Sequence, residues 1–109
     1  MKKLLLLLII NCQLSIFNSY SQNLDFSYNG HARTCILHLP TGYADSVDYP
    51  LVLNLHGYGS NAGQQQVYSG MNTVADTAKF IVAYPNAFNG GWDTNLTVSV
   101  IDDPGYLNA

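Results

Sequence analysis

The sequence predicts an α/β fold in which a β-hairpin precedes a strand–helix–strand unit. Asn29-Gly30 lies between two segments of alternating apolar and polar residues, and Asn-Gly is the strongest short-range hairpin signal. Residues 51–56 form a nearly continuous apolar run, which is typical of a strand covered on both faces. At residues 62–79 the apolar period becomes helical, and a second apolar run follows at 80–85. Together these observations indicate a sheet packed against helices.

The predicted hairpin strands lead into a polar connection. The first strand alternates Leu24, Phe26 and Tyr28 with polar residues. The second ends at Pro40, which has no N–H to donate to a strand ladder. Residues 41–50 then form a polar segment that separates the hairpin from the rest of the chain.

The strand–helix–strand unit implies a parallel pair of strands joined by a right-handed crossover. Gly63 and Gly70 weaken the helical pattern between the strands, and an irregular first turn is expected. Pro85 stops the second strand. The residues expected on the buried side of the helix are Val67, Met71, Val74, Ala75 and Ala78.

One complete helix is too little to cover both faces of a parallel sheet. Residues 86–95 form a loop rich in Asn and Gly, and a further helix is expected to begin at Asp103 and Pro104. Asp can cap such a helix, and Pro suits its first position. The sequence is therefore expected to be the first part of a larger α/β domain, interrupted inside an element.

Residues 1–21 have the pattern of a secretory signal peptide, which leaves residues 22–109 as the incomplete domain. Two lysines precede an apolar run at residues 4–10, which is shorter than the roughly 20 residues of a membrane span. Ser19 and Ser21 place small residues at the −3 and −1 positions of a cut before Gln22. The protein is therefore expected to be secreted, with cleavage near Ser21-Gln22.

A lipoprotein leader that ends at Cys12 is the alternative. Asn11 is a poor residue immediately before a lipidated cysteine, so ordinary secretion is the favoured interpretation.

The chain without its expected leader is acidic. Its two cations, Arg33 and Lys79, face seven aspartates, which gives a net charge of −5. An acidic chain lacks the basic surface that nucleic acids and anionic membranes attract, so neither is an expected partner. Cys35 is the one remaining cysteine, which excludes an internal disulfide framework. No Cys/His spacing matches a zinc site, and neither a metal nor a cofactor is expected.

The most informative short segment is LVLNLHGYGSN at residues 51–61, where an apolar strand runs directly into His-Gly-Tyr-Gly-Ser. A strand that ends in glycines before a helix lies at the carboxyl edge, where α/β sheets bind ligands. Backbone N–H groups left free there can form an oxyanion hole, and removing one such donor costs about 3–4 kcal/mol. A plain strand-ending turn is the alternative. A phosphate loop fits less well, because no Gly-Lys-Ser/Thr follows.

Four segments occur in a characteristic order and spacing: ARTCILHLPTGY, YPLVLNLHGYGSN, FIVAYPNAFNGGWD and IDDPGYLNA. Over residues 26–109 they resemble the polyhydroxybutyrate depolymerase/feruloyl esterase family of secreted α/β-hydrolases. In that family a Pro-Leu-Val strand enters His-Gly, a Tyr-Pro ends the next strand, and a Trp follows. Cys35 and Pro104 depart from the family pattern at structural positions. The resemblance implies an N-terminal fragment of an α/β-hydrolase fold, truncated before the nucleophile elbow.

The resemblance also implies serine-esterase chemistry whose central residues are missing here. The family uses a Ser-His-Asp triad with the serine in a G-x-S-x-G elbow. This sequence contains no such elbow, and neither Ser60 nor Ser69 fits one. All three triad members are therefore expected beyond Ala109, and the isolated chain is expected to be inactive.

The resemblance leaves the oxyanion-hole loop to this chain. Tyr58 and Gly59 are the expected oxyanion-hole residues, with the Tyr58 backbone N–H as the principal donor. His56, Gly57 and Ser60 are expected to support the loop, and His56 is not expected to be the catalytic base.

Other chemically suggestive residues have simpler interpretations. His31 and His38 are expected at the surface or edge of the hairpin. Asp102 and Asp103 look like a catalytic carboxylate pair, but acids at a helix start stabilise the helix dipole, which is the expected role here. Trp92 is either a substrate contact or part of the loop packing.

Two classes of function follow from the sequence. The favoured one is the N-terminal segment of a secreted carboxylic-ester hydrolase, acting on a polyester or on feruloyl or acetyl esters of plant polysaccharide. The alternative is a small secreted carbohydrate-binding or interaction module, in which Trp92 and the eight tyrosines stack on sugar rings. The strand–helix–strand unit favours the hydrolase, because such modules are usually all-β.

Overall fold

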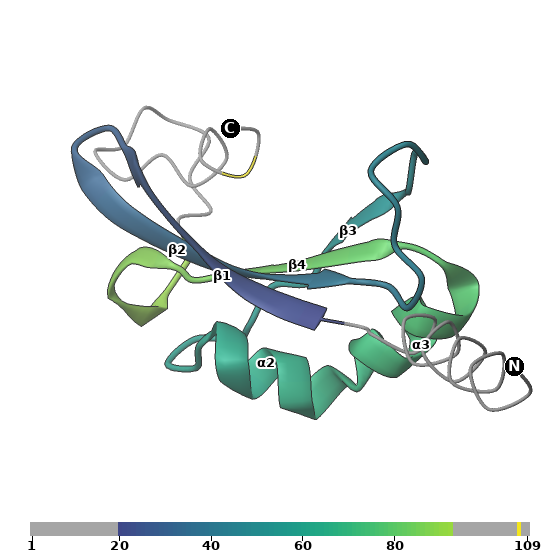
Figure 1. Ribbon diagram of the computed structural model, residues 1–109. Helices are drawn as coiled ribbons and strands as arrows, with labels where there is room; N and C mark the ends of the chain where they lie inside the picture. Colours follow the sequence, from purple (N-terminus) through teal and green to yellow (C-terminus); the bar gives the residue numbers. More distant parts are fainter. Residues whose placement is uncertain (1–19, 93–106, 108–109) are drawn as a thin grey trace, which may run out of the picture.

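The computed structural model describes residues 20–92 and Leu107, which form a four-stranded mixed sheet with two helices on one face (Figure 1). The strand order is β1-β2-β4-β3; β1 and β4 run antiparallel to β2, and β3 runs parallel to β4. The prediction of an α/β fold with a hairpin and a strand–helix–strand unit is confirmed. The elements are β1 (Tyr20–Tyr28), β2 (His31–Leu39), β3 (Leu51–Leu53), α2 (Ala62–Ser69), α3 (Met71–Ala78), β4 (Ile81–Pro85) and the 3-10 turn η1 (Phe88–Gly90).

The hairpin turns at the predicted position. Asn29 and Gly30 have φ angles of 49° and 76°, the positive pair that a two-residue type I′ turn requires. The β1 strand extends back to Tyr20 and so includes the last two residues of the expected leader. The remainder of that leader, and the helix start expected at Asp103 and Pro104, lie outside the described residues.

The β3 strand is shorter than the predicted strand at residues 51–56. The Asn54 N–H still donates to the Ala83 carbonyl at 2.9 Å, but the Asn54 side chain turns toward the helices. Its amide donates to the Ser69 hydroxyl at 3.0 Å and accepts a bond from the Gln65 amide at 2.8 Å. Asn54 is thus the last residue here that bonds to β4, and its side chain already bonds to α2 where the chain leaves the sheet.

The predicted helix at residues 62–79 is divided into α2 and α3. Gly70 adopts φ 60° and ψ 18°, a left-handed conformation that glycine tolerates best and that commonly ends a helix. Asn61 caps α2 by accepting the Gln64 N–H at 2.9 Å. The break therefore comes in the middle of the segment, although the irregularity was expected in its first turn.

The predicted buried side of this helical segment is only partly correct. Ala75 is fully buried and Met71 packs against the core. Val67, Val74 and Ala78 are exposed, which corrects the prediction for these three residues. Because the left-handed Gly70 lies between Val67 and the core residues of α3, Val67 does not share one continuous helical face with them.

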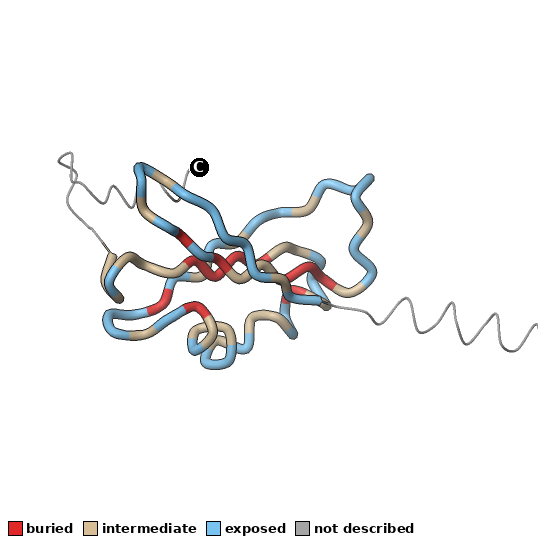
Figure 2. The backbone as a smooth tube through the Cα atoms, turned by 60° about the vertical axis from the view of Figure 1, so that its left-hand side comes forward, coloured by how far each residue is buried: buried red, intermediate tan, exposed pale blue. Residues whose placement is uncertain are grey.

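The core lies between the sheet and the two helices (Figure 2). The Tyr84 hydroxyl donates to the Asn72 side-chain oxygen at 2.7 Å, so this buried polar group has a partner. The fully buried members of the core are Ala62, Ala75, Val82 and Tyr84, against which Ile36, Met71 and Phe80 pack.

The second sheet face, opposite the helices, carries an apolar groove. Leu51 and Leu53 of the edge strand β3 are 59% and 45% exposed there. Leu107, which is helical, also lines the groove. The described part of the chain thus covers the helix side of β3 better than its other side. The groove is lined by Leu24, Phe26, Cys35, Leu37, Leu51, Leu53, Ala83, Pro85 and Leu107.

Candidate functional site

The His-Gly segment forms a tight turn just beyond the carboxyl end of β3. The Ser60 N–H donates to the Gly57 carbonyl at 3.1 Å, which closes a β-turn over residues 57–60. Within this turn Gly59 alone has a positive φ angle, 76°. A positive φ at the third position defines a type II turn, and glycine is the residue that occupies this position without strain.

His56 holds the start of this turn with both of its ring nitrogens. It is 3% exposed, and its Nδ1 lies 2.7 Å from the Gly57 carbonyl oxygen. A carbonyl only accepts, so Nδ1 carries the proton and Nε2 is free to accept the Ala87 N–H at 3.1 Å. Both nitrogens are used in joining the turn to the loop after β4, and neither is left to take a proton from a nucleophile.

Trp92 is hydrogen-bonded to His56, just beyond β3. Its indole N–H donates to the His56 carbonyl at 2.8 Å, and the two rings are tilted at 41° with centroids 5.2 Å apart. The half-buried Trp92 side chain therefore packs on His56 in this structure.

The amides of the turn differ in availability. The Gly59 N–H donates to the Gly90 carbonyl at 2.8 Å, and the Ser60 N–H is used within the turn. Within residues 20–92 and Leu107, the Tyr58 N–H makes no hydrogen bond. Of the two expected oxyanion-hole residues, Gly59 donates its N–H to Gly90, and the Tyr58 N–H has no partner among the described residues.

Asn86 is a positioning residue that sequence reasoning missed. Its side-chain oxygen accepts the Ala62 N–H at 2.7 Å, and its amide donates to the Thr34 hydroxyl at 2.8 Å. Its own N–H donates to the Thr34 carbonyl at 2.9 Å. Asn86 thus joins β2, the end of β4 and the start of α2. Its position directly after the strand-ending Pro85 was the available signal.

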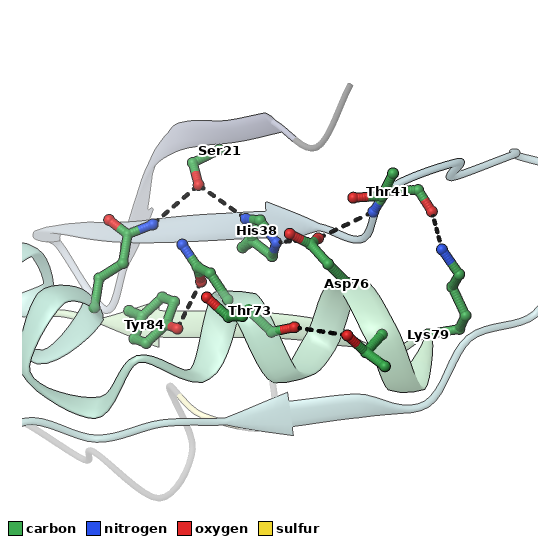
Figure 3. A network of polar contacts seen from close by, with 10 residues as sticks. Ser21, His38, Thr41, Thr73, Asp76, Lys79 and Tyr84 are labelled. Atoms are coloured by element: carbon green, nitrogen blue, oxygen red, sulfur yellow. Dashed lines mark hydrogen bonds and ion pairs between the residues drawn. The ribbon is translucent and has the colours of Figure 1, made fainter. Parts of the chain in front are cut away.

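A second polar network lies on the helix side of the hairpin (Figure 3). His38 is 3% exposed, which corrects the expectation of a surface or edge residue. Its Nε2 lies 2.9 Å from an Asp76 carboxylate oxygen, and its Nδ1 lies 3.2 Å from the Ser21 hydroxyl. The Gln66 amide donates to the same hydroxyl at 2.9 Å. Buried against α3, His38 is held by polar partners from β1 and α3.

The electrostatics of this network centre on Asp76. Burial would raise its pKa, but hydrogen bonds from His38 and from the Thr41 N–H outweigh burial and hold the pKa below its ordinary value. The trio of Ser21, His38 and Asp76 has the residue types of a catalytic triad. It lies near the amino end of β4, where His38 pairs with Val82, and so away from the His-Gly turn. We interpret this network as a structural connection between the hairpin and α3.

Other candidate residues contribute less to a site. His31 is half-buried, with its ring centroid 4.7 Å from that of Phe88. Asp102 and Asp103 lie outside the described residues. In the described part of the chain no three His, Cys, Asp or Glu side chains are grouped for a metal, and no helix is long and apolar enough to cross a membrane.

Neither family models nor curated proteins match this sequence, but solved structures do. A ferulic acid esterase matches with a TM-score of 0.63 and 18% identity, over 84% of this chain and 41% of that one. The S-formylglutathione hydrolase FrmB of Staphylococcus aureus matches with 0.58 and 17%, over 84% and 41%. A ferulic acid esterase of Anaeromyces mucronatus, solved in complex with ferulic acid, matches with 0.50 and 20%, over 72% and 32%.

These similarities establish the fold. The chain has the fold of an α/β-hydrolase fragment. It spans about two-fifths of the length of the first two of these structures. The resemblance to esterases is thus supported at the level of the fold, whereas polyhydroxybutyrate depolymerase stays a prediction.

Proposed function

We propose that this chain is the N-terminal segment of a secreted carboxylic-ester hydrolase and supplies one donor of its oxyanion hole. The observation that carries the proposal is the Tyr58 N–H, which has no partner among residues 20–92 and Leu107 and is held in a type II turn beyond the carboxyl end of β3. Ligand sites of α/β sheets lie at this edge. A donor without an internal partner at this edge can stabilise the negative oxygen that develops when a serine attacks an ester carbonyl.

The other residues of the turn serve to fix that donor. His56 bonds to Gly57 and to Ala87, and the Ser60 hydroxyl donates to the Gln64 side-chain oxygen of α2 at 2.9 Å. A preorganised donor stabilises the transition state without first having to reorient. We assign the nucleophilic serine, the catalytic histidine and the acid to sequence beyond residue 109, because no G-x-S-x-G elbow occurs here.

The proposed substrates are esters of polymers: feruloyl or acetyl esters on plant polysaccharide, or a polyester such as polyhydroxybutyrate. The ferulic acid esterases among the structural neighbours support the first of these classes. Trp92 keeps its indole N–H on the His56 carbonyl, so its proposed contact with substrate would use the ring face.

Secretion is part of the same proposal and has its own test. Mass spectrometry of the exported protein is expected to find an N-terminus at or near Gln22. A protein that retains Met1, or one lipidated at Cys12, would contradict it.

The oxyanion role can be tested by removing the backbone N–H of Tyr58. Proline fits the second position of a type II turn but has no N–H, so Tyr58→Pro deletes the donor and preserves the turn. In a gene product that carries the proposed sequence beyond residue 109, Tyr58→Pro is expected to lower kcat about 10²–10³-fold with KM little changed. Tyr58→Ala is the matched control, because it removes the ring and keeps the N–H.

Two results would contradict the assignment. One is a Tyr58→Pro enzyme as active as the wild type. The other is a Tyr58→Ala enzyme that loses as much activity as Tyr58→Pro, since the side chain and not the amide would then matter. An inactive wild-type protein, assayed on nitrophenyl, feruloyl and hydroxybutyrate esters, would refute the hydrolase proposal itself.

A further inference from the structure

The Asn- and Gly-rich loop after β4 lies directly against the His-Gly turn. The Gly90 carbonyl accepts the Gly59 N–H at 2.8 Å, and a Cβ on Gly90 would lie 3.8 Å from the Gly59 Cα. Gly90 has φ 79°, and Asn89 before it has φ 53°. The carbonyl that meets Gly59 is therefore presented by two consecutive left-handed residues, a conformation that suits Asn and Gly in particular.

Gly91 makes room for the ring of Tyr58. A Cβ on Gly91 would lie 3.0 Å from Cδ2 and 3.1 Å from Cε2 of that ring. Carbon atoms in ordinary contact are about 3.5–4.0 Å apart, so any larger residue at this position displaces the ring or the loop. Tyr58 is 94% exposed, and Gly91 is the backbone against which its ring lies.

Hydrogen bonds on either side of the two glycines anchor the loop to the end of β3. The Ala87 N–H donates to the His56 ring, and the Trp92 indole N–H donates to the His56 carbonyl. The loop is thus attached to His56 at both ends and touches the turn with its middle.

We propose that residues 87–92 position the oxyanion donor, and that Gly90 and Gly91 are the residues through which they do so. The inference rests on the proposed function and extends it. The Gly90 carbonyl accepts the Gly59 N–H, so that the Tyr58 N–H is left as the donor for substrate. Gly91 sets where the Tyr58 ring lies beside that donor. Both glycines act through the turn and are positioning residues, since neither has to touch substrate.

The test compares three substitutions in the full-length gene product. Gly90→Val places a β-branched residue at a positive φ and is expected to move the carbonyl off Gly59. Gly90→Asn is the conservative variant, because Asn tolerates this conformation. Gly42→Val is the matched control: Gly42 has φ 78° in a turn closed by the Tyr43 N–H on the Pro40 carbonyl, with no atom within 4 Å of its would-be Cβ.

Two readouts separate positioning from general damage. For Gly90→Val, hydrogen exchange at the Gly59 amide is expected to accelerate about tenfold or more. Its kcat is expected to fall about 10²-fold with KM nearly constant, as for a catalytic group misplaced by roughly 1 Å. Gly90→Asn should keep both the Gly59 exchange rate and kcat close to their wild-type values, and Gly42→Val should change neither. Unchanged Gly59 exchange in Gly90→Val, or an equal kcat loss in Gly42→Val, would overturn the proposal.

A double-mutant cycle tests the part played by Gly91. Gly91→Ala is expected to lower kcat in the wild-type background and to have no further effect when Tyr58 is already Ala, because the ring it would strike is gone. The same loss in both backgrounds would mean that Gly91 does not act through Tyr58. If the wild-type protein hydrolyses no ester, the proposed function fails, while the Gly59 exchange rates still decide whether the loop holds the turn.

Discussion

The two faces of the sheet differ in cover although the same four strands build both. On the helix side Val82 and Tyr84 are fully buried, whereas Leu51 and Leu53 on the second sheet face are about half exposed. Side chains of a strand alternate between faces, so Val52 lies on the helix side between these two leucines. The apolar residues of β3 thus point to both faces of the sheet, but the described residues cover only the helix side. The comparison separates the sheet face that the described residues cover from the face that they leave open.

The largest expected effect concerns the isolated segment. Residues 22–109 expressed alone are expected to aggregate or to form a molten state, because β3 is an edge strand and the second sheet face is apolar. Size-exclusion chromatography and thermal unfolding measure this directly. A sharp monomer peak with a cooperative melt would mean that the chain closes its own core, and would favour the small binding module.

The next effect tests the covered face. Tyr84→Ala removes a fully buried ring and its bond to Asn72, and is expected to cost about 3–5 kcal/mol of unfolding free energy in the full-length gene product. Tyr68→Ala is the matched control, because this tyrosine of α2 is 86% exposed, and a change within about 0.5 kcal/mol is expected. Urea unfolding gives both values. Similar losses at the two positions would show that the helix side is not the main core.

A charge on the second sheet face is expected to have opposite effects in two proteins. In isolated residues 22–109, Leu53→Lys should raise the soluble fraction, because lysine on an edge strand opposes intermolecular pairing. In the full-length gene product the same change should cost about 2 kcal/mol or more, since the missing cover would bury an unpaired charge. Val67→Lys, on the exposed side of α2, is the control for both. If Leu53→Lys improved both proteins, or harmed both, the proposal that further chain covers this face would be contradicted.

The smallest effect concerns Asp76, whose pKa is below its ordinary value of 3.8 in the folded protein. The unfolded chain therefore binds the proton more readily than the folded one. The stabilisation is complete above the ordinary value and is lost as the pH falls through the folded pKa. Asp76→Asn should remove this acid dependence, which is on the order of 1 kcal/mol for a partly exposed pair. Urea unfolding of the wild type and of Asp76→Asn from neutral to acidic pH measures this dependence. Identical profiles of unfolding free energy against pH would refute the prediction.

The sequence by itself determined the elements whose signals are local. The Asn29-Gly30 turn needs positive φ at two positions, which few other residue pairs adopt, and the apolar runs at 51–56 and 80–85 predicted β3 and β4 with their parallel pairing. The glycines after the strand likewise predicted a turn, because glycine adopts a positive φ without strain, and Gly59 does so in the structure.

Only the tertiary structure decided which groups meet. The break at Gly70 separates the exposed Val67 from the helical face that carries buried Ala75. His38 is buried and bonded to Asp76 of α3, which lies 38 residues away in the chain. The Gly59 N–H is hydrogen-bonded because the Gly90 carbonyl reaches it from a different loop. Hydrogen bonds between distant segments depend on how the elements pack, and residue spacing carries no information about them. The sequence could therefore predict a turn after the strand, and only the fold shows which of its amides are hydrogen-bonded in the described part of the chain.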